Sequence, residues 1–260
     1  MSARGHHRTR LWYPPRMQWW RFFGPGALAW TLRQGRHALI DRLRGAPPRP
    51  TRARDYVARH AAEGNADEVL AALDRYAREE RFLMSVGPEK GPLLSEMIAR
   101  LPDEARVLEL GAYCGYSAIM IAQRLGPGGR LVSIEKDPVN AESARDNLAR
   151  AGFSDRVELR CASSSDEIPR LEGPFDLVFL DHWKDLYRPD LVLLEEHGLI
   201  RPGSIIVADN TGKIFGPTAY LDYVRTCGRY DSESRPAHVE YTSIPDAVEI
   251  SVFRGSRAPA

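Results

Sequence analysis

The sequence predicts an α/β fold, with a doubly wound, mostly parallel sheet of seven strands, an antiparallel C-terminal hairpin and helices at the N-terminal end. From residue 105 onward, short apolar runs alternate with amphipathic stretches of about ten to fifteen residues. Such alternation of strand and helix is typical of a parallel sheet covered on both faces. Two extended segments then follow each other closely near the C-terminus, which indicates an antiparallel hairpin that closes the sheet.

Five apolar runs supply the predicted parallel strands. They are Arg106–Leu110, Leu131–Ile134, Val157–Leu159, Asp176–Leu180 and Ser204–Ala208. The hairpin is predicted from Val239–Ser243 and Ala247–Phe253, with Pro245-Asp246 between its strands. Two helices should precede the sheet. One follows a capping box formed by Asn65 and Glu68, and the other runs from about Pro88 to Arg100.

Charge divides the chain into two unlike parts. The 260 residues include 36 Lys and Arg and 35 Asp and Glu, and 43% are hydrophobic, which excludes a disordered or collagen-like chain. Residues 1–54 hold twelve Arg, no Lys, one Asp and no Glu, so their charge is 12 − 1 = +11 and residues 55–260 carry 1 − 11 = −10. A turn-rich linker, Gly45–Pro50, lies near this change. We therefore predict a basic arm over residues 1–54 and a single domain over residues 55–260.

Cysteine usage and hydropathy bear on the compartment. The three cysteines form no C-x-x-C pair and have no histidine at zinc-ligand spacing, so we expect reduced thiols and a cytoplasmic protein. No apolar run reaches the roughly 18 residues of a membrane span.

Unusual residues follow the first two predicted strands, at the edge where open parallel sheets bind ligands. Gly111 and Gly115 bracket a tight turn that lets a ligand approach the backbone. The spacing is neither G-x-G-x-x-G nor a phosphate-binding P-loop. Glu135 ends the second strand, where an acid can accept hydrogen bonds from both ribose hydroxyls of a nucleoside. A nucleoside cofactor without a pyrophosphate, such as S-adenosylmethionine (SAM), fits this pattern.

The fourth and fifth predicted strands end in oxygen ligands. Asp181 follows one strand, and Asp209 and Asn210 follow the next. A single Asp at a strand end is commonly a helix N-cap, but three such residues at one edge suit Mg²⁺ with open coordination positions.

Together these segments resemble the catechol O-methyltransferase family. The matching blocks are Leu108–Ser117, Phe179–Lys184 and Ala208–Asn210, with His60–Asn65 and Met84–Gly87 upstream. The resemblance spans roughly residues 55–254 and leaves the arm uncovered. It implies the SAM-dependent methyltransferase fold, which is Rossmann-like, with SAM and Mg²⁺ as cofactors and a small catechol as substrate. The residues that match cofactor contacts are Met84, Val86, Glu109, Gly111, Tyr113, Ser117, Glu135, Ser163, Asp181 and His182.

The resemblance also implies a reaction site. Lys184 matches the general base, and Glu240 matches the acid that accepts a hydrogen bond from the second catechol hydroxyl. Trp183 matches a wall of the substrate groove. The implied metal ligands are Asp181, Asp209 and Asn210, and the implied substrate contacts are Asp181, Trp183, Lys184, Asn210 and Glu240.

Three functions are compatible with this set. The first is a Mg²⁺- and SAM-dependent catechol O-methyltransferase. The second is the related type that methylates phenylpropanoid or other vicinal-diol phenols. The third is a catalytically silent SAM-binding adaptor that acts through its basic arm.

The arm itself admits several interpretations. It holds twelve Arg and four of the five tryptophans, Trp12, Trp19, Trp20 and Trp30. Its Trp, Phe and Arg mixture fits peripheral contact with an anionic membrane surface. Alternatives are a targeting presequence and a helix that packs on the acidic domain through its arginines. No recognised nucleic-acid module accompanies the charge, so we expect no nucleic-acid partner.

Overall fold

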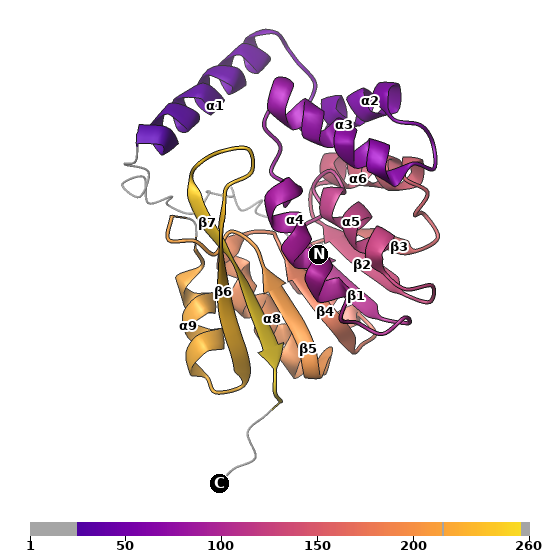
Figure 1. The fold of residues 1–260 in the computed structure, drawn as a ribbon, viewed down its shortest axis with the longest axis vertical. Coiled ribbons are helices and arrows are strands. Elements are labelled where there is room, and N and C mark those ends of the chain that lie inside the picture. The colour runs from indigo at the N-terminus through magenta and orange to yellow at the C-terminus, as the bar shows by residue number, and fades with distance from the viewer. Residues whose placement is uncertain (1–24, 215, 256–260) are drawn as a thin grey trace, which may run out of the picture.

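A computed structural model describes residues 25–214 and 216–255, and seven strands form one sheet within them (Figure 1). The strands are β1 (Arg106–Leu110), β2 (Arg130–Glu135), β3 (Val157–Cys161), β4 (Phe175–Leu180), β5 (Ile200–Ala208), β6 (Tyr230–His238) and β7 (Pro245–Phe253). Their order in the sheet is β3-β2-β1-β4-β5-β7-β6. Strands β1 to β5 are parallel, and β7 pairs antiparallel with both β5 and β6. The predicted fold is confirmed.

The strand order reverses at β1, which lies between β2 and β4. In open α/β sheets, the crevice beyond the carboxyl ends of the strands at such a point is where ligands bind. Leu110 at the end of β1 is in register with Ile134 of β2 and Leu180 of β4. The residues that follow these three strands therefore emerge at the same height.

Two layers of helices cover the sheet because successive strand residues point to opposite faces. Val107 of β1 packs in one buried cluster and Leu108 in the other. The first cluster includes α2 (Arg49–His60), α3 (Ala66–Glu79), α4 (Gly87–Ile98), α5 (Tyr116–Arg124) and α6 (Pro138–Arg150). The second includes α8 (Tyr187–Glu196) and α9 (Thr218–Thr226), and the short α7 (Ser164–Glu167) leads into it.

The predicted capping box begins α3. The side chain of Asn65 accepts a hydrogen bond from the backbone amide of Glu68 at 3.1 Å. Helix α4 spans almost the stretch predicted for it. Five predicted strands are likewise found, each extended by a few residues at most.

The first strand of the predicted hairpin was placed wrongly. Residues 239–243 form the turn, and the strand that pairs with β7 is β6, which ends at His238. Strand β6 lies at the edge of the sheet, where polar residues and a proline are tolerated. Its sequence, YDSESRPAH, therefore lacks the apolar signal of a central strand. Pro245 and Asp246 belong to β7 instead of the turn.

The arm is described from residue 25 onward, and Trp12, Trp19 and Trp20 lie outside the described residues. Helix α1 (Pro25–Leu43) ends before the predicted linker, and α2 begins at Arg49, so the predicted boundary at residue 55 falls inside α2. In the described part of the chain, no helix is long and apolar enough to cross a membrane. The three cysteines are free thiols.

Candidate active site

The turn after β1 holds the ends of two strands together. Gly111 has φ +104°, and a Cβ at this position would lie 2.5 Å from the carbonyl oxygen of Asp181. Gly115 has φ +82° and precedes α5 directly. Both residues use the left-handed region that favours glycine. Gly111 thus allows Asp181, at the end of β4, to lie against the β1 turn.

Glu135 fixes the same turn from the end of β2. Its Oε2 accepts a hydrogen bond from the backbone amide of Tyr113 at 2.9 Å, and its Oε1 accepts one from the amide of Asp137 at 2.9 Å. The carboxylate is therefore oriented by the backbone on both sides. Its position at the end of β2, beside the glycine turn, is the one predicted for the ribose acid.

Glu109, in the neighbouring strand β1, carries a fully buried carboxyl group. Its Oε2 accepts a hydrogen bond from the hydroxyl of Ser133, while Oε1 is buried without a hydrogen-bond partner among the described residues. Burial raises the pKa of Glu109 to about 7, against the effect of the nearby hydroxyls of Ser117 and Ser133. A buried oxygen of this kind is suited to accept a hydrogen bond from a cationic amino group of a ligand.

The raised pKa of Glu109 predicts a pH dependence of stability. The folded protein holds this proton more tightly than the unfolded chain, so its contribution to stability is complete below pH 4.5 and is lost as the pH rises through about 7. The Glu109→Gln variant removes this titration. Both proteins are compared without cofactor. The difference in unfolding free energy, variant minus wild type, should rise by on the order of 3 kcal/mol between pH 4.5 and 8.

Urea denaturation at several pH values measures this difference. The exposed Glu172 provides the matched control, since Glu172→Gln should leave the pH dependence as it is in wild type. A pH-independent difference between Glu109→Gln and wild type would contradict the assignment.

His182 follows Asp181 in the chain. Its ring is held by helix α8, which packs in the second buried cluster. Its Nε2 lies 2.8 Å from Oδ2 of Asp190 in α8, and Asp190 also accepts a hydrogen bond from Ser165 at 2.9 Å. Nδ1 of His182 is buried and has no hydrogen-bond partner among the described residues. Burial lowers the pKa of His182, which favours the neutral ring. Ser163, another predicted cofactor contact, is the N-cap residue of α7 and lies two residues before Ser165 in the chain.

Lys184 lies next to Asp181 and is tied to the end of β5. Its Nζ is 3.5 Å from Oδ1 of Asp181 and donates a hydrogen bond to the hydroxyl of Tyr187 at 2.7 Å. The Tyr187 hydroxyl in turn donates to the backbone carbonyl of Asp209 at 3.2 Å. Tyr187 is fully buried, so it is a rigid support for the lysine.

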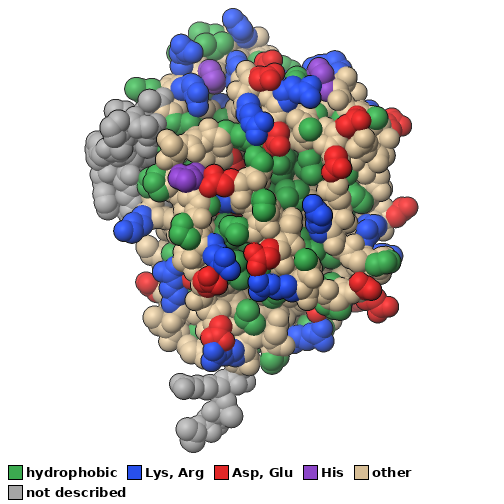
Figure 2. Space-filling view, in the orientation of Figure 1, with side chains coloured by type: hydrophobic (Ala, Val, Ile, Leu, Met, Phe, Trp, Pro, Cys, Tyr) green, Lys and Arg blue, Asp and Glu red, His purple; other side chains and the backbone are tan. Residues whose placement is uncertain are grey.

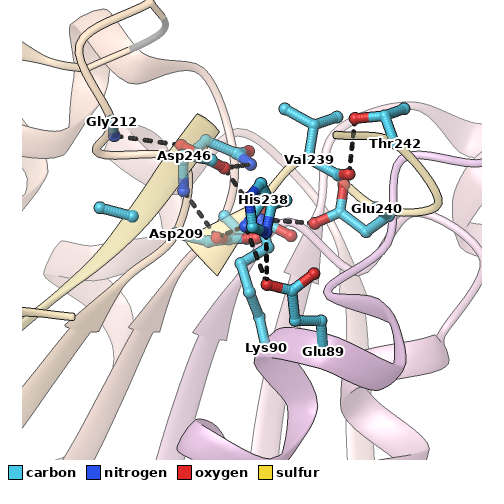
Figure 3. Close-up of polar contacts among 12 residues, drawn as sticks. Glu89, Lys90, Asp209, Gly212, His238, Val239, Glu240, Thr242 and Asp246 are labelled. Atoms are coloured by element: carbon cyan, nitrogen blue, oxygen red, sulfur yellow. Dashed lines mark hydrogen bonds and ion pairs between the residues drawn. The ribbon is translucent and has the colours of Figure 1, made fainter. Parts of the chain in front are cut away.

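Asp209 and Asn210 directly follow β5, and Asp209 takes part in a buried ion cluster (Figure 3). Oδ1 of Asp209 accepts hydrogen bonds from Nζ of Lys90 at 2.6 Å and from the backbone amide of Asn210 at 2.6 Å. The side-chain amide of Asn210 donates to Oδ2 of Asp246 at 2.9 Å. The amide nitrogen is thereby directed at β7, which leaves the carbonyl oxygen on the other side, where a hard cation could bind it.

Glu240 joins this cluster from the β6–β7 turn. Its Oε1 lies 2.5 Å from Nζ of Lys90, which also lies 3.1 Å from Oδ2 of Asp246. A Cβ on Gly87, at the start of α4, would lie 2.8 Å from Cγ of Glu240, so the helix approaches the acid closely. Lys90 is completely buried. We call Lys90, Asp209, Glu240 and Asp246 the buried ion cluster.

The net negative charge of this region would be balanced by a divalent cation. The buried ion cluster, Lys184 and Asp181 together contain two ammonium and four carboxyl groups, a formal charge of −2 when all are ionised. Burial and the charge of Asp209 raise the pKa of Asp181 to about 7, and burial raises that of Glu240 to about 8 despite Lys90. Asp181, Asp209 and Asn210 offer two carboxylates and one amide oxygen, a donor set that fits Mg²⁺. Among the described residues, no group of three or more His, Cys, Asp or Glu is arranged to hold a metal.

Backbone strain gathers around the same edge. The non-glycine residues with positive φ in the described part of the chain are Tyr113 at +47°, Asn210 at +51° and Tyr241 at +58°. Tyr113 and Asn210 are themselves predicted site residues, and Tyr241 directly follows Glu240. Such strain persists where the surrounding structure determines a side-chain position, and it is often found at functional sites.

Two predicted contacts are largely open to solvent. The side chain of Met84 is 67% exposed and that of Trp183 is 51% exposed, whereas Val86 is buried. Met84 and Trp183 therefore lie at the surface, where a ligand could cover them.

Four residues that support the site were not predicted from the sequence, namely Lys90, Asp190, Tyr187 and Asp246. One signal could have revealed Lys90. It precedes Leu94 by four and Met97 by seven residues, so the apolar period of α4 directs it toward the core.

The strand order, with β7 antiparallel between β5 and β6, and the acids at the strand ends place the molecule in the structural class of SAM-dependent methyltransferases. A family model described as O-methyltransferase matches residues 59–219. Catechol O-methyltransferase B of Danio rerio is 42% identical over 240 residues, which cover 90% of this chain and 89% of that protein. Catechol O-methyltransferase of Bos taurus is 36% identical over 249 residues, 92% of this chain and 89% of that one. The chain belongs to the O-methyltransferase family.

A solved structure supports this placement. The O-methyltransferase TomG from Streptomyces achromogenes, determined in complex with SAM, is 28% identical and superposes with a TM-score of 0.63. The match covers 73% of this chain and 91% of that one.

Proposed function

We propose that the protein transfers the methyl group of SAM to one hydroxyl of a catechol held by Mg²⁺, with Lys184 as the general base. The observation that carries this proposal is the meeting of Asp181, Lys184, Asp209, Asn210 and Glu240 at one edge of the sheet. The catechol O-methyltransferases of Danio rerio and Bos taurus, which match most of this chain, support the substrate class.

The cofactor would lie across the ends of β1 and β2. Glu135 would accept hydrogen bonds from the ribose hydroxyls, and the unpartnered Oε1 of Glu109 suits the amino group of the methionine part. The unpartnered Nδ1 of His182 suits a donor or acceptor on the adenine ring. The remaining proposed contacts, from the turn and the segments beside it, are Met84, Val86, Gly111, Tyr113, Ser117, Ser163 and Asp181.

Asp181, Asp209 and Asn210 would hold Mg²⁺. When bound, the cation supplies a positive charge that favours the ionised form of a catechol hydroxyl and fixes both oxygens of the diol. Lys184 would accept the proton of the reacting hydroxyl at Nζ, and Tyr187 keeps that amine beside Asp181. Glu240 would accept a hydrogen bond from the second hydroxyl, and Trp183 would form a wall for the ring. Positioning of this kind can account for a large part of the rate enhancement.

A methyl-transfer assay tests the proposal. The purified protein is incubated with SAM, catechol and MgCl₂, and the methylated product is measured with and without a chelator. We expect product formation that stops when the metal is removed. Failure to methylate any vicinal diol, with SAM binding intact by calorimetry, would contradict the proposal and favour a silent SAM-binding protein.

We also propose that the outer face of α1 contacts an anionic membrane surface. Three leucines at i, i+7 and i+11 are exposed on this face, Leu32 by 66%, Leu39 by 57% and Leu43 by 77%. Arg36 and Arg42 are exposed among them. Figure 2 shows hydrophobic and basic side chains gathered over α1. Apolar side chains interspersed with arginines are the pattern of helices that bind at the headgroup level.

Sedimentation with vesicles tests this contact. The full chain should bind phosphatidylserine-containing vesicles better than purely zwitterionic ones. Replacing Leu32, Leu39 and Leu43 together by Gln should lower the partition coefficient at least about tenfold. Val252→Gln, which changes an exposed apolar residue of β7, is the control and should bind as wild type does. Equal binding by the triple variant would refute the contact.

A further inference from the structure

Helix α1 packs on the rest of the protein, which we call the body (residues 49–255), through one stripe of side chains. Contacts come from Trp30, Gln34 and Asp41, among others, and these three are spaced at i, i+4 and i+11. Asp41 lies 2.8 Å from Nη2 of Arg81 and 2.7 Å from Nη2 of Arg52. These ion pairs join the C-terminal half of α1 to the segment before α4 and to α2. The helix therefore has a defined position on the body.

The N-terminal half of α1 is held by an apolar contact. The ring of Trp30 meets the ring of Phe82 edge to face, with centroids 5.1 Å apart and an interplanar angle of 89°. A guanidinium nitrogen of Arg49 donates hydrogen bonds to the side chain of Gln34 and to the backbone carbonyl of Phe82, each at 3.4 Å. Trp30, Phe82 and Ile214 pack on the buried Val239 and Ile244. We call these five residues the outer cluster.

Every body residue of the outer cluster is a near neighbour of a proposed site residue in the chain. Phe82 precedes Met84 by two residues, and Ile214 follows Asn210 by four. Val239 and Ile244 flank Glu240 in the β6–β7 turn, over which α1 lies in Figure 1. The outer cluster is thus the apolar border of the region to which a diol would be bound. A diol held by its two oxygens presents the rest of its ring, and any substituent, away from the metal ligands.

We propose that Trp30 is a specificity-determining residue: it forms the outer wall of the substrate groove and selects catechols that carry an apolar ring substituent. This inference rests on the proposed function. An apolar substituent that covers Phe82 and Trp30 removes apolar surface from water, whereas unsubstituted catechol does not reach them. The consequence is a lower KM for the substituted substrate, without a change in the chemistry at Lys184.

Steady-state kinetics with catechol and 4-butylcatechol tests the role of Trp30. In Trp30→Ala, KM for 4-butylcatechol should rise about tenfold. Its kcat and both constants for catechol should stay within about twofold of wild type. Trp30→Phe should restore most of the loss because it keeps an aromatic ring. Leu32→Ala, on the exposed face of the same helix, is the matched control and should behave as wild type.

Two results would overturn the inference. One is an unchanged KM for 4-butylcatechol in Trp30→Ala, and the other is an equal rise in KM for both substrates. Circular dichroism checks that the variant is folded. If it is not, Trp30→Leu replaces it, with the same expected direction. Wild-type protein that methylates neither substrate would be a failure of the proposed function, which is distinguishable from these outcomes.

Discussion

Lys184→Ala is expected to lower kcat by about 10²- to 10⁴-fold, the usual contribution of a general base. The side chain lies 3.5 Å from Asp181 and is held by the fully buried Tyr187, so it is fixed beside the proposed metal ligands. The affinity for SAM should change little, because the proposed cofactor contacts lie at the ends of β1 and β2. Stopped-time product assays give kcat, and calorimetry gives the dissociation constant of SAM.

The pH dependence separates a base from a merely structural lysine. As the pH rises, more of the substrate ionises in solution and needs no base, so the defect of Lys184→Ala should shrink. A structural role predicts a constant defect, and a loss of SAM binding would also contradict the assignment. Arg100→Ala, which removes an exposed cation in the turn after α4, should leave kcat unchanged.

Lys90→Met is expected to reduce the free energy of unfolding by about 3–5 kcal/mol, the cost of breaking a buried ion pair on one side. The lysine is fully buried and lies within 3.1 Å of three carboxylates, those of Asp209, Glu240 and Asp246. Burial opposes its charged form, but these carboxylates outweigh burial and the pKa of Lys90 lies above its usual value. The variant leaves the three carboxylates facing one another without a cation.

Urea denaturation at pH 7 measures the loss. The exposed Lys136 is the matched control, and Lys136→Met should change the unfolding free energy by no more than about 0.5 kcal/mol. A similarly small effect for Lys90→Met would show that water or a shifted backbone compensates for the missing cation. That result would contradict the role given to the buried ion cluster.

Most of the parallel half of the sheet could be predicted from the sequence because β1, β2, β4 and the C-terminal half of β5 are largely buried on both faces. Strand β1, for example, is apolar apart from Arg106 and Glu109, and its predicted bounds are those found. Strand β6 could not be found in this way because it lies at the edge, where its side chains need not be apolar. The turn of the hairpin was then displaced toward β7, and Asp246 was taken for a turn residue.

The strand-end residues proposed as metal ligands were predicted to lie together because parallel strands end at one edge of the sheet. Their support was not predicted, since it comes from elements far apart in the sequence. Lys90 reaches Asp209, which is 119 residues away, and Asp246, which is 156 away. Trp30 belongs to the arm, whose basic charge favoured a membrane contact. The contact of Trp30 with Phe82 could not be predicted because it depends on the tertiary position of α1.

In the proposed reaction, the site binds a diol through both of its oxygens. The most direct test compares turnover of catechol with turnover of guaiacol, 2-methoxyphenol, at saturating SAM and Mg²⁺. Guaiacol keeps the ring and one hydroxyl but lacks the second hydroxyl that Glu240 and the metal would engage. We predict that catechol is methylated at least about a hundredfold faster. Equal rates for the two compounds would contradict the proposed use of both oxygens.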